Sequence, residues 1–327
     1  MSKLQKSVVS EDEAGIRLDR WFKRHFPDLT HGQLEKMLRT GQIRVAGKRA
    51  ESATRLEAGQ DLRLPPQLIA PPNGGSHKTG NAIRSTHDAA DLKKMVLFED
   101  EDVWVLNKPP GLAVQGGTGL KTSLDQMLEA LAHAKHGKPK LVHRLDRDTS
   151  GVLLVARTPY AATRLTESFR HRETQKIYWG LTVGVPRPDS GTVEAALVRR
   201  GETMIVASPG YEEAKKAVSL YRTVDRAKDL AAFVALWPVT GRTHQLRVHM
   251  AHLGTPLLGD RLYGSPLPEG FPSDDLGKGL HLHARRIIIP HPRRGIIDVT
   301  APLGSAMKAS WSWFGFDLNA EVDFLGH

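Results

Sequence analysis

The feature that most constrains the fold of this chain is a long segment without apolar periodicity between two patterned regions. From Pro65 to about Asp91 the chain is rich in Pro, Gly, Ser, Asn and Thr, a composition typical of linkers. The chain has 327 residues, enough for a large domain and a small one. We therefore predict an N-terminal domain over residues 14–64, a linker over 65–94 and a main domain over 95–327.

The N-terminal region has the pattern of a small α/β unit. Apolar residues between 16 and 26 recur at helical spacing, and a second helical pattern around 34–38 ends before Gly41. Ile43 and Val45 come next, and Leu62 and Leu64 alternate with charged residues before the linker. This alternation predicts short strands after the two helices.

Basic residues gather around the second of these helices and the strand that follows it. They are Lys36, Arg39, Arg44, Lys48 and Arg49, and the first four are the candidate RNA contacts. Over the whole chain, 46 Lys and Arg against 36 Asp and Glu give a formal charge of +10 and a pI near 9.8. Such a charge favours polyanionic partners. The cluster is therefore either a phosphate-binding surface or an ordinary solvated face, and charge alone leaves both open.

The main region mixes strands and helices without a strict βαβ rhythm. Strand-like runs lie at 96–98, 103–106, 152–155 and 233–236, and helical patterns lie near 123–134 and 159–171. No Gly-x-Gly-x-x-Gly or Walker sequence is present. We predict an α+β domain with a mixed, mostly antiparallel central sheet flanked by helices rather than a Rossmann fold.

The densest group of chemically active residues runs from His143 to Gly151, just before a strand. Catalytic groups are often carried by such loops on rigid scaffolds. Arg144 and Arg147 flank Asp146, and nearby cations favour the charged carboxylate. Three interpretations remain open from the residues alone. They are a surface salt-bridge cluster, a catalytic carboxylate, and a Mg²⁺ site of Asp146 and Asp148, which the neighbouring arginines disfavour.

The segment from His143 to Asp146, followed by Thr149-Ser150-Gly151-Val152-Leu153, closely resembles the signature of RluA-type pseudouridine synthases. Further elements of that family follow the same order along the chain, at 106–111, 176–178, 241–249, 257–264 and 282–284. Residues 14–64 resemble an S4 RNA-binding domain. Together these segments resemble the large-subunit ribosomal RNA branch of the family.

This resemblance implies an isomerase that converts uridine to pseudouridine in RNA without a cofactor. It makes Asp146 the catalytic nucleophile, acting either on the ribose carbon or on a ribose proton. It places Tyr178 against the target base and Arg247 in an ion pair with Asp146. The apolar positions Leu246, Met250 and Leu253 predict a helix over 243–253 with an inward stripe, and Arg247 lies outside that stripe. The resemblance also makes Arg144 the wedge that enters the RNA as the uridine flips out, and the alternative for this residue is a contact with a phosphate.

Four further residues are expected to support the site. Lys176 lies two positions before Tyr178 on the same strand, so both side chains face the same way. The family segments also contain His143, Arg242 and His244. We expect no metal, because His244 and His249 are five residues apart rather than the four of a helical zinc site, and cysteine is absent.

The expected partner is large-subunit ribosomal RNA, and a transfer RNA substrate is the alternative that keeps the same chemistry. A second alternative is a non-catalytic RNA-binding or ribosome-assembly factor, which the intact Asp146, Tyr178 and Arg247 disfavour. No apolar run approaches the ~20 residues of a membrane span, and the polar start lacks a signal-peptide core. We expect a cytoplasmic monomer.

Overall fold

The computed structural model describes residues 5–324 apart from 27–28, 30, 66–67, 69–87, 117–121, 133–136, 172, 209 and 323. The chain divides into two compact units, Met1–Thr79 and Gly80–His327. Most of the predicted linker lies outside the described residues. Each unit is described by itself below.

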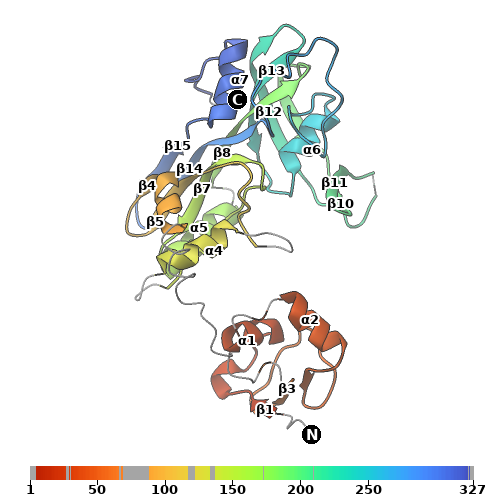
Figure 1. The fold of residues 1–327 in the computed structure, drawn as a ribbon, viewed down its shortest axis with the longest axis vertical. Coiled ribbons are helices and arrows are strands. Elements are labelled where there is room, and N and C mark those ends of the chain that lie inside the picture. Colours follow the sequence, from red (N-terminus) through yellow and green to blue (C-terminus); the bar gives the residue numbers. More distant parts are fainter. Residues whose placement is uncertain are drawn as a thin grey trace. The chain divides into compact units, whose positions relative to one another are not determined.

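The first unit contains two helices and a three-stranded antiparallel sheet (Figure 1). The helices are α1 (Leu18–His25) and α2 (His31–Arg39), and the short 3-10 helix η1 (Glu11–Glu13) precedes them. The sheet has the order β1-β3-β2, from β1 (Gln5–Val8), β3 (Asp61–Leu64) and β2 (Arg44–Val45). Because β1 pairs with β3 along its whole length, this unit begins earlier than the predicted position 14.

The second unit also begins earlier than predicted. Residues 88–95 are helical, although the linker was expected to extend to residue 94. Leu92 is 1% exposed and packs in one hydrophobic cluster with Leu106 and Leu153. This end of the predicted linker therefore belongs to the core of the larger unit.

A large mixed sheet forms the frame of the second unit. Its main path is β4-β5-β7-β14-β8-β13-β12-β9, with β15 paired to β14 and β6 paired to β7. The only parallel pairing among these described strands joins β14 to β7, which confirms the expected mostly antiparallel mixed sheet. The strands are β4 (Val96–Glu99), β5 (Val103–Lys108), β6 (Lys140–Leu141), β7 (Ser150–Ala156), β8 (Gln175–Val183), β9 (Ser190–Glu194), β12 (Val218–Ala227), β13 (Ala231–Pro238), β14 (Leu282–Pro290) and β15 (Ile296–Thr300).

Helices pack on both faces of this sheet. Near β4, β5 and β7 lie α4 (Leu124–Met127), the 3-10 helix η3 (Leu128–Leu131) and α5 (Pro159–His171). Near β12 and β13 lie α6 (Gln245–His252) and α7 (Ser305–Phe314). The separate hairpin of β10 (Leu197–Arg200) and β11 (Thr203–Val206) lies beside α6 (Figure 1).

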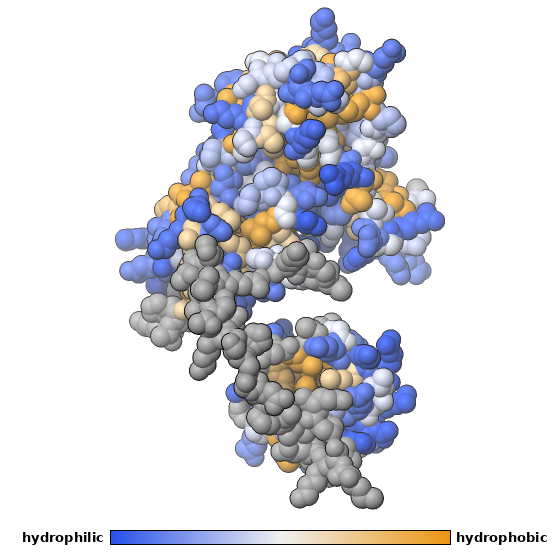
Figure 2. All heavy atoms as spheres, viewed as in Figure 1, coloured by the Kyte–Doolittle hydropathy of each residue, from blue (hydrophilic) through white to orange (hydrophobic). Residues whose placement is uncertain are grey.

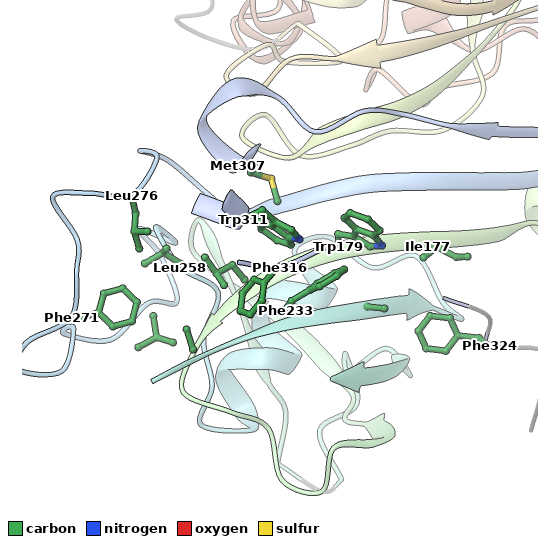
Figure 3. Packing of buried hydrophobic residues seen from close by; sticks show 14 residues of the cluster. Ile177, Trp179, Phe233, Leu258, Phe271, Leu276, Met307, Trp311, Phe316 and Phe324 are labelled. Carbon is green, nitrogen blue, oxygen red and sulfur yellow. The ribbon is translucent and has the colours of Figure 1, made fainter. Parts of the chain in front are cut away.

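Strand β13 shows why this sheet needs cover on both sides. Alternate residues of a strand point to opposite faces. Phe233 packs with Trp179 and with Trp311 of α7, as the close view in Figure 3 shows. Val234, its neighbour, belongs instead to a cluster with Leu246 and Met250 of α6, residues that we predicted to form the inward stripe of that helix. The face covered by α6 is the one that carries the site described below.

The surface view in Figure 2 shows hydrophilic residues around the outline of the larger unit, with hydrophobic residues interspersed among them. Within the described part of the chain, no helix is both long and apolar enough to cross a membrane.

Candidate active site

A pocket of about 470 Å³ opens on the face of the sheet that α6 covers. Its walls come from the loop between β6 and β7, from β8, from the turn after β13 and from the start of α6. The pocket gathers every site residue that we predicted in the main domain: His143, Arg144, Asp146, Lys176, Tyr178, Arg242, His244 and Arg247.

A buried lysine supports the loop that carries Asp146 through hydrogen bonds to main-chain carbonyl groups. Lys108 is fully buried, and its Nζ donates 2.9 Å hydrogen bonds to the carbonyl oxygens of Pro109, Leu112 and Arg147. Burial lowers the pKa of Lys108 to about 8, although the charges of Asp148 and Asp146 act in the opposite direction. Sequence reasoning quoted the segment that contains Lys108 but assigned the lysine no role.

His143 fixes the first part of the same loop. Its Nε2 accepts a 2.8 Å hydrogen bond from the backbone N–H of Leu154, and its ring stacks on Phe169 at 4.7 Å. Burial and the positive charge of Lys176 lower the pKa of His143 to about 3. His143 is therefore neutral at physiological pH and anchors the loop to β7.

Tyr178 and Lys176 point into the pocket from the same face of β8, as their spacing of two residues predicted. The intervening Ile177 faces the opposite core. Burial and the negative charge of Asp146 raise the pKa of Tyr178, so the phenol keeps its proton. Burial lowers the pKa of Lys176.

Arg247 is buried and forms a two-pronged ion pair, but its partner is Asp260 rather than Asp146. Nε of Arg247 lies 2.7 Å from Oδ2 of Asp260, and a terminal nitrogen lies 2.6 Å from Oδ1. The expected direct ion pair of Arg247 with Asp146 is therefore not the one that the described residues form. The charge of Asp146 still raises the pKa of Arg247, so the two groups interact electrostatically without a direct hydrogen bond.

Asp260 is completely buried at its side chain. Burial by itself raises the pKa of Asp260, but hydrogen bonds and the charge of Arg247 outweigh it, and the pKa is lowered. The backbone N–H groups of Leu262 and Tyr263 also donate to its Oδ1. Asp260 was quoted only as part of the family segment 257–264, so its contact with Arg247 was missed.

His244 immediately precedes α6 and has a left-handed backbone, with φ 52° and ψ 16°. Its Nδ1 lies 2.7 Å from the hydroxyl oxygen of Tyr263. The ring of Tyr263 in turn lies 5.1 Å from the guanidinium of Arg247. Arg242 is exposed at the rim, where its Nε donates to the carbonyl of Lys216.

Two buried hydroxyls also line the pocket. Thr149 and Thr174 are 2% and 5% exposed, and their Oγ1 atoms have no hydrogen-bond partner among the described residues. Buried hydroxyls are usually paired. In these two threonines the hydroxyl oxygens are both shielded from solvent and unpaired within the part of the chain that the structure describes.

The buried histidines outside the pocket have structural partners. His249 bonds the hydroxyl of Ser219, His281 bonds that of Ser310, and His283 bonds that of Ser150. The described residues contain no group of three His, Asp or Glu side chains that could hold a metal ion.

The basic residues of the first unit lie on two neighbouring elements. Lys36 and Arg39 are exposed on α2, Arg44 is half-buried on β2, and Lys48 is exposed in the turn that follows β2. Arg44 also stands directly opposite Arg63 of β3. Like charges directly opposite each other in a sheet are unfavourable.

Comparisons with known proteins agree with the fold of the larger unit. The model of the RNA pseudouridylate synthase family matches residues 102–252, a range that includes Asp146, Tyr178 and Arg247. The chain belongs to this family of RNA-modifying enzymes.

Two relatives that match most of the chain are both named ribosomal large subunit pseudouridine synthase C. The chain is 35% identical over 316 residues to ribosomal large subunit pseudouridine synthase C of Escherichia coli K12, covering 92% of this chain and 93% of that protein. It is 36% identical over 310 residues to the protein of the same name from Salmonella typhimurium, with 92% and 93% covered. Among solved structures, human RNA pseudouridylate synthase domain containing 4 is 30% identical with a TM-score of 0.62, covering 72% of this chain and 98% of that one.

Proposed function

We propose that this protein converts specific uridines to pseudouridine in large-subunit ribosomal RNA, with Asp146 as the catalytic carboxylate. The observation that carries the proposal is the pocket in which Asp146 lies together with Tyr178, Arg144 and Arg247. The names of the relatives support the choice of RNA. The proposal includes the cytoplasmic location and the monomeric state expected from the sequence.

The pocket residues suit the steps of this reaction. The uridine is flipped out of its stack at a cost of a few kcal/mol, and Arg144, exposed at the pocket, fills the space it leaves. Asp146 then attacks the ribose carbon or removes a ribose proton, which frees the base from C1′. The ring of Tyr178 stacks on the base, and its protonated hydroxyl is able to donate a hydrogen bond as the base turns and reattaches.

The test uses the purified protein with unmodified large-subunit ribosomal RNA and transfer RNA, followed by mapping of pseudouridine at single nucleotides. The variant Asp146→Asn keeps the shape of the side chain and is expected to abolish product with little change in RNA affinity. Asp148→Asn, an exposed carboxylate outside the pocket, is the matched control and is expected to remain active. Equal loss in both variants would favour a shared structural or Mg²⁺-binding role.

The same experiment separates the alternatives. Product at discrete large-subunit uridines supports the proposal, and product only in transfer RNA supports the other substrate. Tight binding without product in any RNA would identify a non-catalytic binding or assembly factor.

We further propose that the first unit is an S4-like RNA-binding domain whose contacts are Lys36, Arg39, Arg44 and Lys48. The cross-strand pair of Arg44 and Arg63 supports this, because an anionic partner relieves the repulsion of neighbouring like charges. Changing both arginines to Gln is expected to weaken RNA binding and to reduce the slope of log affinity against log salt by about 1 to 2. Lys308→Gln, at an exposed position of α7 across the sheet from the pocket, is the control for the loss of one positive charge. An equal effect per charge removed would contradict the assignment.

A further inference from the structure

The hydrogen bonds around Tyr263 decide how the ring of His244 faces the pocket. The backbone N–H of Met204, on β11, donates to the hydroxyl oxygen of Tyr263 over 2.9 Å. The same oxygen lies 2.7 Å from Nδ1 of His244. Within the described residues, Nδ1 is the one acceptor in hydrogen-bonding contact with this hydroxyl. Tyr263 therefore donates its proton to Nδ1.

A neutral imidazole that accepts at Nδ1 carries its proton on Nε2. Burial is the largest influence on the pKa of His244 and lowers it below the ordinary value, which favours the neutral ring. The surrounding charges act in both directions: Asp146 and Asp260 raise the pKa, and Arg247 and Arg144 lower it. His244 therefore has an N–H donor on the side of its ring away from Tyr263, and no described residue accepts from it.

The backbone at His244 gives an independent reason to assign this residue a role. A positive φ is uncommon for residues other than glycine, and such conformations gather at functional sites. Here the conformation places His244 at the turn into α6, in the pocket wall beside Arg247. The Tyr263 ring packs edge-on against it at 5.6 Å.

We infer that His244 donates a hydrogen bond from Nε2 to an acceptor oxygen of the target uridine, and that Tyr263 is a positioning residue that holds His244 in this tautomer. The inference rests on the proposed function. The uridine offers such acceptors in its two base carbonyls and its ribose hydroxyl. One unpaired donor at this place would orient the nucleotide relative to Asp146.

Two substitutions of His244 separate this role from a structural one. The amide of Asn reaches the place of Nδ1, so His244→Asn preserves the contact with Tyr263 and removes the donor in the pocket. The longer Gln carries its amide nitrogen to the place of Nε2, so His244→Gln preserves the donor and gives up the contact with Tyr263. We expect the single-turnover rate to fall about tenfold or more in His244→Asn and clearly less in His244→Gln, with unchanged RNA affinity. The reverse order would show a structural role and overturn the inference.

Tyr263→Phe tests the positioning role. This variant keeps the ring beside Arg247 and removes only the hydroxyl. We expect a slower single-turnover rate because the tautomer of His244 is no longer fixed. We also expect an altered pH–rate profile, because the neutral ring loses the hydrogen bond at Nδ1 that opposes its protonation. His244→Gln has no Nδ1 to accept a hydrogen bond from Tyr263. Adding Tyr263→Phe to that variant is therefore expected to cause no further loss of single-turnover rate. Additive losses would overturn the positioning role.

The acceptor is found by comparing RNAs with 2-thiouridine, 4-thiouridine or 2′-deoxyuridine at the target. The ratio of the wild-type rate to that of His244→Asn is expected to approach one on the RNA that lacks the relevant oxygen, and a ratio unchanged on all three would overturn the inference. Absence of product from the wild-type protein would defeat the proposed function itself. Full activity in His244→Asn beside an active wild type would defeat only this inference.

Discussion

Arg247 and Asp260 face each other in a buried pair in which two guanidinium nitrogens meet two carboxylate oxygens at 2.6 and 2.7 Å. This geometry fixes the orientation of Arg247 before any RNA is bound. The guanidinium of Arg247, whose positive charge acts on Asp146, is thus held in place by Asp260, which does not line the pocket. Asp260 links the segment after α6 to Arg247 of that helix.

Asp260→Asn is expected to destabilise the protein by about 3–5 kcal/mol, because it leaves Arg247 buried without a counter-charge. We also expect a lower single-turnover rate. The matched control is Asp298→Asn, which breaks a similar pair with Arg286 at half-exposed positions and should cost about 1 kcal/mol or less. Thermal and denaturant unfolding measure the stability of both variants. Similar losses of stability would show that burial of the Arg247–Asp260 pair does not matter.

Lys108→Met is expected to loosen the loop that carries Asp146. Methionine has a similar length but leaves the carbonyl oxygens of Pro109 and Leu112 without their lysine donor, whereas the carbonyl of Arg147 keeps the N–H of Gly111. We expect a loss of roughly 2 to 4 kcal/mol. Faster hydrogen exchange in residues 141–150 would accompany a slower reaction. Lys140→Met, an exposed change on neighbouring β6, serves as control. Unchanged hydrogen exchange in Lys108→Met would show that this lysine does not stabilise the loop.

Gly151→Ala is expected to disrupt the junction of β7 and β14. Gly151 has φ +107°, and a Cβ there would lie 2.2 Å from the carbonyl oxygen of Ala284, so a backbone shift is unavoidable. We expect a loss of more than about 3 kcal/mol. Gly201→Ala, with φ +61° and open space around it, should cost about 1 kcal/mol. Equal stability of the two variants, measured by denaturant unfolding, would refute the close approach.

Glu13 is expected to make the first unit sensitive to acid. Burial alone raises its pKa, but hydrogen bonds with His25, Trp21 and Ser10 outweigh it and lower the pKa from 4.5 to about 2. A carboxyl with a lowered folded pKa contributes stability above its unfolded pKa and loses it as the pH falls through the folded one. This contribution should therefore be present above pH 4.5 and decline between pH 4.5 and about 2.

The measurement is hydrogen exchange of peptides within 5–64 in the full chain. Glu13→Gln should lower the protection of these peptides at neutral pH by roughly 1–3 kcal/mol, and the difference from the wild type should shrink in acid. Glu57→Gln, at an exposed position, is the control. A difference that stays constant down to pH 2 would show that the charge of Glu13 does not matter.

Local patterns predicted much of the site. The spacing of Lys176 and Tyr178 placed both on one strand face, and the apolar positions Leu246 and Met250 predicted the buried stripe of α6. These inferences succeeded because strand and helix periods relate residues a few positions apart. The strands that were missed or shortened, such as Gln5–Val8, depend on a partner more than fifty residues away, and local patterns carry little information about it.

The sequence by itself determined the family, the loop that carries Asp146 and the kinds of side chain that line the pocket, because these are written in short motifs and local periods. Only the tertiary structure decided that Arg247 pairs with Asp260 and that Lys108 donates hydrogen bonds to the main chain of the loop. It also decided that the hydroxyl of Tyr263 contacts Nδ1 of His244. For each of these contacts the sequence offers several groups that could serve as the partner. The choice among them depends on which distant segments the packed sheet and helices bring within hydrogen-bonding distance.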